Sequence, residues 1–239
     1  MDEVTLKTFI LTLSANAADS DLKFLPARNY QGFPENNIGR DIDLLLWTRD
    51  IARWKIVLEK TCVQLKLSLR QGVRRFYGHE MYIGGIAGRI SELEIDLELN
   101  LNWRGIDFLD VDQVINRALH LSGDIWIPHP ADECVISFCM SYLHGGFVKE
   151  KYLPSMSEQA RNDKDEVFRL MSHIFGKKIA EKIVVSLIEK DIHEISTKAT
   201  KYRIRVLFRG FLRHPLTFIY TFIAGYYLDF KARTRSAKA

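Results

Sequence analysis

Two segments of the chain alternate acidic and aliphatic residues, and this pattern constrains the fold more than any other feature. The first reads DIDLLLW at residues 41–47, and the second reads SELEIDLELNLNW at residues 91–103. A period of two is typical of a strand that is buried on one face only, because successive side chains point to opposite sides. We therefore expect both segments to be strands, each with its own acids on one face and its aliphatic residues on the other.

The segments around these strands complete a small α/β unit. The spacing of apolar residues predicts a helix over residues 4–17 and a long amphipathic helix over residues 50–72. Residues 22–30 and 74–85 are expected to be strands. Pro26 lacks a backbone N–H, so its strand should lie at a sheet edge or be kinked.

From about residue 110 onward, helical periodicity replaces the alternating pattern. We predict helices over residues 110–121, 131–147, 162–176 and 177–195. The predicted fold class is α+β, with a small mixed β-sheet core and flanking helices, followed by a helical C-terminal region. The expected divisions are an α/β core at residues 1–108, a helical domain at residues 109–200 and a basic amphipathic tail at residues 201–239.

Charge is divided unevenly along the chain, which carries a formal net charge of +4 over 239 residues. From Lys198 to the end there are ten Lys and Arg residues and one acid, a balance of +9, so the remainder carries −5. An acidic body argues against a protein that coats nucleic acid, and no nucleic-acid partner is expected. The basic tail favours an anionic partner of its own.

The tail contains an apolar block at residues 215–228, with arginines on both sides. This block is shorter than the roughly 20 residues that a membrane-spanning helix needs. Its composition is typical of an interfacial helix on an anionic inner membrane leaflet. A terminal helix that packs on the domain, or on a second subunit, is the alternative interpretation.

The N-terminal segment and the cysteines indicate in which cellular compartment the protein is expected. The N-terminus, MDEVTLKTFILTL, begins acidic and lacks the basic region and cleavage site of a signal peptide. Cys62, Cys134 and Cys139 have no paired metal spacing, so we interpret them as buried thiols in a reducing compartment. The expected location is cytoplasmic, and peripheral on the inner membrane face if the tail binds lipid.

Asp41 and Asp43 lie two residues apart on the first acidic strand, so their carboxylates should project from the same face. Two adjacent carboxylates repel each other, and a bound divalent cation would remove that repulsion. Oxygen ligands of this kind suit Mg²⁺, which shares its shell between carboxylates and substrate phosphates. Gly39, just upstream, would let a phosphate approach the backbone closely.

Asp96 on the second acidic strand is a candidate third carboxylate. If the two strands are neighbours, three acids converge, and such a cluster can hold two metals about 4 Å apart, as in phosphoryl transfer. The plainer interpretation treats Asp41 as a turn residue and Asp43 as a polar residue at a strand end.

The segments IGRDIDLLL and LEIDLEL resemble the motif of the nucleotidyltransferase superfamily, which has the DNA polymerase β-like fold. In that motif a glycine-containing turn precedes Asp-hydrophobic-Asp on one strand, and a later strand supplies a third Asp. Over roughly residues 20–155, the segments LPARNY, LEIDLELNLNWRGIDFL and VKEKY further resemble a bacterial branch linked to surface-polysaccharide synthesis. The resemblance implies a nucleotidyltransferase core. It makes Asp41 and Asp43 the metal-binding pair and Asp96 a metal ligand or the activator of an acceptor hydroxyl.

The chain departs from this family where Gly-Ser usually ends the first strand and grips the triphosphate. The corresponding region here reads PARNY, so the resemblance implies Arg28 and Asn29 as the replacement phosphate contacts. Lys149 and Lys151, which follow a glycine pair, are further candidates because a lysine can contact a triphosphate as a point charge. A solvated basic turn is the alternative for these two lysines.

The implied function is Mg²⁺-dependent transfer of a nucleoside monophosphate from an NTP such as ATP to a hydroxyl or phosphate, with release of pyrophosphate. The acceptor would be a small molecule or glycan, in line with surface-polysaccharide biosynthesis. One alternative is a catalytically silent protein of the same fold that binds a partner, which the PARNY departure favours. A glycosyltransferase with an Asp-x-Asp metal site ranks lower, because only 40 residues precede Asp41.

Overall fold

The computed structural model describes residues 4–35, 41–74, 78–88, 91–213, 215–216, 218–224 and 227. The chain divides into two compact units. The described residues up to 100, together with residues 111–128, form the first unit, and residues 101–110 with those from 129 to 227 form the second. The boundary expected at residue 108 therefore falls inside a segment of the second unit.

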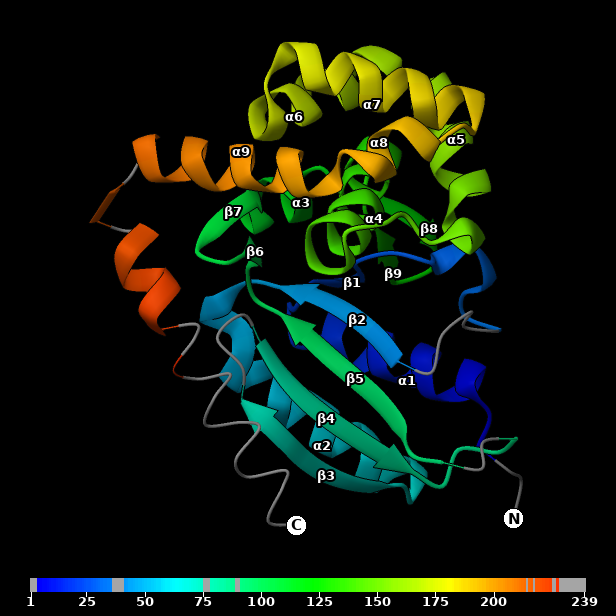
Figure 1. Cartoon of the computed structure of the whole chain (residues 1–239). Helices are drawn as coiled ribbons and strands as arrows, with labels where there is room; N and C mark the ends of the chain where they lie inside the picture. The colour runs from blue at the N-terminus through cyan, green and yellow to red at the C-terminus, as the bar shows by residue number, and fades with distance from the viewer. Residues whose placement is uncertain are drawn as a thin grey trace. The chain divides into compact units, whose positions relative to one another are not determined.

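The first unit is built on a five-stranded mixed sheet (Figure 1). Its strands are β1 (Phe24–Pro26), β2 (Asp41–Leu46), β3 (Ser68–Arg74), β4 (Gly78–Gly84) and β5 (Leu93–Glu98), in the order β1-β2-β5-β4-β3. The β2–β5 pair is parallel and the other neighbours are antiparallel. Pro26 lies in the edge strand β1, as its missing N–H predicted.

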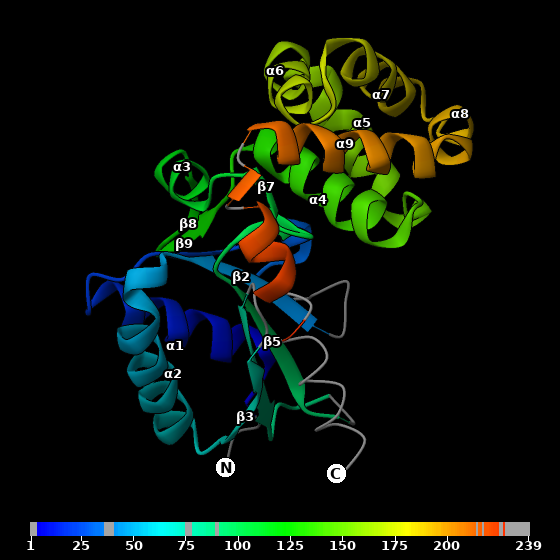
Figure 2. The same cartoon turned by 60° about the vertical axis from the view of Figure 1, so that its left-hand side comes forward.

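Two helices, α1 (Leu6–Ala18) and α2 (Ile51–Leu65), pack on one face of this sheet (Figure 2). The side chain of Thr5 caps α1 by accepting a hydrogen bond from the Thr8 backbone N–H. The aliphatic residues of the alternating strands meet these helices in one core, which includes Ile42, Leu44, Ile95, Leu97, Met81, Ile83, Trp54 and Leu58. The acids on the same strands therefore occupy the opposite face.

The helix predicted over residues 50–72 is wrong in its last part. α2 ends at Leu65 because Lys66 adopts a left-handed conformation, with φ of 56°, and its N–H bonds back to the carbonyls of Cys62 and Val63. The next residues form β3 instead. Alternation of Leu67 and Leu69 with polar residues was the signal for this strand, and it overlapped the apolar period of the helix.

The helix predicted over residues 110–121 is also shorter than expected. α3 (Val111–Asn116) is followed by a hairpin of β8 (Leu119–Ser122) and β9 (Ile125–Ile127). The turn places Gly123 at a φ of 52°, a region that residues with a Cβ rarely adopt. This short hairpin belongs to the first unit.

The second unit begins with a hairpin of β6 (Leu101–Trp103) and β7 (Ile106–Leu109). Arg104 and Gly105 form its two-residue turn with φ of 50° and 84°, the positive values typical of the tightest hairpin turns. The strand predicted over residues 91–103 is thus two strands, β5 and β6, which belong to different units.

The described residues of the second unit also form α4 (Pro130–Gly145), α5 (Leu153–Asn162), α6 (Lys164–Phe175), α7 (Lys177–Glu189), α8 (His193–Thr197) and α9 (Ala199–Arg213). Helical residues follow α9 at 215–216, 218–224 and 227. The helix predicted over 177–195 is divided because Lys190 takes a left-handed conformation after α7. The sequence interpretation missed α5.

Helix α4 is buried over most of its length, which explains its nearly continuous apolar sequence. Phe138 and Tyr142 stack on each other with centroids 4.9 Å apart, and Phe175 of α6 meets both rings edge-on. The Tyr142 hydroxyl donates a 2.7 Å hydrogen bond to the Ile195 carbonyl, which ties α8 to this core. All three cysteines are buried free thiols, as predicted.

Helix α9 contains the first part of the predicted basic tail. Its Tyr202 and Val206 side chains are buried, so it packs within the second unit. Farther on, the Thr221 hydroxyl donates to the Gly105 carbonyl over 3.1 Å, while Leu216 and Ile223 remain exposed. Among the described residues, no helix has the length and apolarity needed to cross a membrane.

The aliphatic face of the sheet predicts the effect of truncating a core residue. Ile95 is fully buried on β5, so Ile95→Ala should lower the free energy of unfolding by about 2–5 kcal/mol. Ile56→Ala is the matched control: its side chain on α2 is 65% exposed, and the change should stay within about 0.5 kcal/mol. Urea unfolding of both variants measures the difference, and equal effects would contradict the assigned core.

Candidate metal site on the sheet

The parallel pairing of β2 with β5 brings the predicted acids together. In the register of these strands Asp43 lies beside Asp96, and Asp41 lies beside Glu94. Carboxylate oxygens of Asp41, Asp43 and Asp96 all lie within 4.8 Å of one another. The structure thus gathers the three acids at one place on the face of the sheet that does not contact α1 and α2.

A second group of carboxylates adjoins the first. Glu80 on β4 lies beside Asp96, and oxygens of Glu80, Glu94 and Asp96 are again within 4.8 Å of one another. Glu80 and Glu94 were not among the residues predicted for the site. The alternation on β5 already placed Glu94 on the face of Asp96, whereas Glu80 could be found only from the β4–β5 register.

The Tyr82 side chain on β4 lies next to the carboxylates of this second group. Its hydroxyl donates to Glu80 Oε2 at 3.2 Å and lies 3.5 Å from Glu94 Oε1. Burial, together with the nearby charges of Glu80 and Glu94, raises the pKa of Tyr82 to about 12. The phenol therefore stays protonated and serves as a hydrogen-bond donor to the carboxylates.

Arg28 is the cation of the cluster. Its Nε donates to Asp43 Oδ2 over 2.6 Å, and the two side chains are only 11% and 8% exposed. The backbone holds this pair in place, because the N–H of Ala27 donates to the Asp43 carbonyl at 2.8 Å. Arg28, which the resemblance assigned to a phosphate, is therefore bound to a carboxylate of the same site.

Of the other predicted site residues, one lies outside the described residues and the rest are not on the strands of this sheet. Asn29 follows Arg28 in a left-handed conformation with φ of 61°, at the start of a 3₁₀ turn, η1 (Tyr30–Gly32). Gly39 falls outside the described residues. Lys149 and Lys151 belong to the second unit, where both ammonium groups lie over the ring of Tyr152. They are not among the residues that this sheet brings together.

The donor set fits a hard divalent cation. Both groups offer carboxylate oxygens, which are the ligands that Mg²⁺ prefers. Because Asp96 belongs to both groups, the arrangement could hold two cations with a shared ligand, the type of centre used in phosphoryl transfer.

Comparisons with protein-family models, curated proteins and solved structures gave no match.

Removing Arg28 should destabilise the protein, because its ion pair with Asp43 is buried. Arg28→Met leaves the buried Asp43 carboxylate without its cation, and should lower the free energy of unfolding by about 3 kcal/mol without metal. The double variant Arg28→Met with Asp43→Asn should recover part of that loss. Urea unfolding in EDTA measures all members of the cycle.

Arg169→Met serves as the control for this cycle. Its pair with Glu166 is on the surface, with the Arg169 side chain 60% exposed, so the loss should stay below about 1 kcal/mol. Additive effects of Arg28→Met and Asp43→Asn would contradict a direct coupling between the two charges.

Proposed function

We propose that the protein is a Mg²⁺-dependent nucleotidyltransferase that transfers a nucleoside monophosphate from an NTP to an acceptor. The observation that carries this proposal is the convergence of Asp41, Asp43 and Asp96 within 4.8 Å on two parallel strands. The sequence resemblance supports the same activity. The acceptor class, a small molecule or glycan, rests on that resemblance alone.

In the proposed reaction the acceptor oxygen bonds to the α-phosphorus while the bond to the pyrophosphate oxygen breaks. Asp41 and Asp43 would hold the metal, which when bound supplies positive charge to the triphosphate. We propose that Asp96 accepts the proton of an acceptor hydroxyl and also acts as a metal ligand. Arg28 orients the Asp43 carboxylate through its 2.6 Å hydrogen bond.

A second candidate is a catalytically silent protein of the same fold. The observation that favours it is the Arg28–Asp43 pair, because a guanidinium that already neutralises one acid weakens the demand for a cation. The two candidates differ in what they expect of metal and nucleotide, so binding and turnover must be measured separately.

Binding is the first test. A ligand that occupies only the folded state stabilises it by about 2.7 kcal/mol at a hundred times its Kd, a rise of several degrees in Tm. We expect Mg²⁺ with one of the four NTPs to raise the Tm of the wild type, and Asp41→Asn or Asp96→Asn to abolish the rise. Asp124→Asn, a change of the same kind at an exposed turn of the same unit, should keep it.

Turnover is the second test, followed as pyrophosphate release with candidate hydroxyl acceptors. The enzyme proposal expects Mg²⁺-dependent release that Asp96→Asn lowers by about 100-fold or more, the scale of a general-base contribution. Nucleotide binding without any release would favour the silent alternative. A wild type with no response to Mg²⁺ or NTP would overturn both the metal site and the enzyme.

A further inference from the structure

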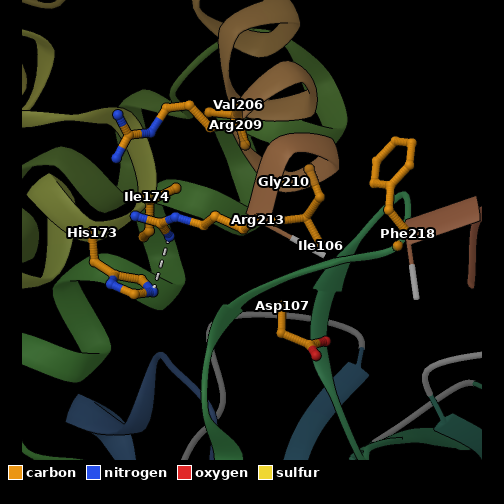
Figure 3. A pocket seen from close by; sticks show the side chains of 10 residues that line it. Ile106, Asp107, His173, Ile174, Val206, Arg209, Gly210, Arg213 and Phe218 are labelled. Carbon is orange, nitrogen blue, oxygen red and sulfur yellow. Dashed lines mark hydrogen bonds between the residues drawn. The ribbon is translucent and has the colours of Figure 1, made fainter. Parts of the chain in front are cut away.

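The second unit contains a cavity of about 500 Å³, a size typical of small-ligand sites (Figure 3). It lies between β7, α6, α9 and the helical residues that follow α9. Every residue that lines it belongs to the second unit, so the cavity is separate from the carboxylate site on the sheet.

Cationic and basic side chains gather at one end of this cavity. Arg209 and Arg213 lie one turn apart on α9, and His173 reaches in from α6. Arg213 Nη1 and His173 Nε2 are 3.2 Å apart, as the dashed line in Figure 3 shows. Within the part of the chain that the structure describes, no carboxylate forms an ion pair with either guanidinium, and Arg209 Nε is buried without a hydrogen-bond partner.

One acid, Asp107 on β7, also lines the cavity. Its carboxylate accepts a 2.8 Å hydrogen bond from Asn102 Nδ2, and Figure 3 shows it directed away from the two guanidinium groups. Among the described residues, therefore, no carboxylate neutralises the two arginines. Arg209 is partly buried and Arg213 is exposed one turn farther along α9. Their like charges repel each other, and a bound anion would relieve that repulsion.

Burial and the neighbouring positive charges lower the pKa values of His173 and Arg209. Burial, and then the charges of Arg213, Arg209 and Arg169, lower the pKa of His173. Burial, and then Arg213 and Arg205, lower the pKa of Arg209. His173 therefore tends to be neutral and to accept from Arg213, which leaves the remaining N–H groups of both arginines as donors.

The rest of the cavity wall is apolar. Ile106, Ile174, Val206 and Phe218 line it beside the cationic end. A ligand that fits should therefore carry an anionic group at one end and an apolar portion at the other. Two guanidinium groups with an adjoining imidazole offer more hydrogen-bond donors than the two oxygens of a carboxylate need, which favours the three terminal oxygens of a phosphate monoester.

We propose that this cavity binds the phosphate monoester group of a partly apolar ligand through Arg209, Arg213 and His173. The phosphate could belong to a lipid headgroup or to a soluble phosphorylated compound, since both present the same group. The proposal does not depend on the function proposed for the carboxylate site.

Calorimetry on the full chain at fixed ionic strength tests this site with three probes: inorganic phosphate, short-chain phosphatidic acid below its micelle concentration, and vesicles containing long-chain phosphatidic acid. We expect both soluble probes to bind, and the short-chain lipid to bind more tightly because its acyl chains reach the apolar wall. Arg209→Gln and Arg213→Gln should each weaken this binding about ten-fold or more, because each removes charge-assisted hydrogen bonds.

Arg205→Gln is the matched control, since it removes the same charge from the same helix at an exposed position that does not line the cavity. It should change affinity by about two-fold at most, through screened long-range attraction. Arg209→Lys, which keeps the charge but loses the planar fork, should fall between the wild type and Arg209→Gln. Unchanged melting curves would show that the variants are folded.

An NMR titration of His173 gives a second readout, because a bound phosphate should raise the pKa of that imidazole in the wild type. Failure of both soluble probes to bind, or an equal loss in Arg205→Gln, would overturn the proposal. Vesicle binding that needs Arg209 and Arg213, together with weak binding of the soluble probes, would identify a lipid source. Vesicle binding that is indifferent to both arginines would overturn the cavity as the site.

Discussion

The parallel pairing of β2 with β5 is the interaction on which the candidate site depends. It sets Asp43 beside Asp96 and Asp41 beside Glu94, while the intervening aliphatic residues form the core under α1 and α2. A slip of one residue would turn every acid into the core and every aliphatic side chain outward. The burial of Ile95 and Leu97 therefore fixes the position of the carboxylates, so the stability of the first unit and the geometry of its acids have the same cause.

The fold could be predicted where one periodicity was unambiguous. The strand at Asp41, the acidic face of β5 and the helices α1, α4 and α6 follow directly from patterns of two or of three to four residues. Prediction failed where a left-handed residue ended a helix, at Lys66 and at Lys190, because no glycine marked either end. It also failed at β8, where the four residues LHLS are too short a segment to distinguish a strand from the last turn of a helix.

The candidate site, too, could be predicted only in part from the sequence. Asp41, Asp43 and Asp96 could be grouped because each strand carried its own signal, but Glu80 required knowledge of which strand pairs with β5. The ion pair of Arg28 with Asp43 was not foreseen, because it depends on how the chain leaves the edge strand. The cavity around Arg209 and Arg213 depends on tertiary packing of α6, α9 and β7, for which no local pattern exists.

The division of the chain has a consequence for how the protein is made and dissected. Residues 101–110 lie between two parts of the first unit in sequence, yet they belong to the second. Neither unit is a continuous stretch, so a single cut in the backbone separates neither from the other. During synthesis the sheet of the first unit has all its strands once β5 is made, but α3 and the β8–β9 hairpin follow only after the β6–β7 hairpin. That hairpin, in turn, is made before any of the helices that complete its own unit.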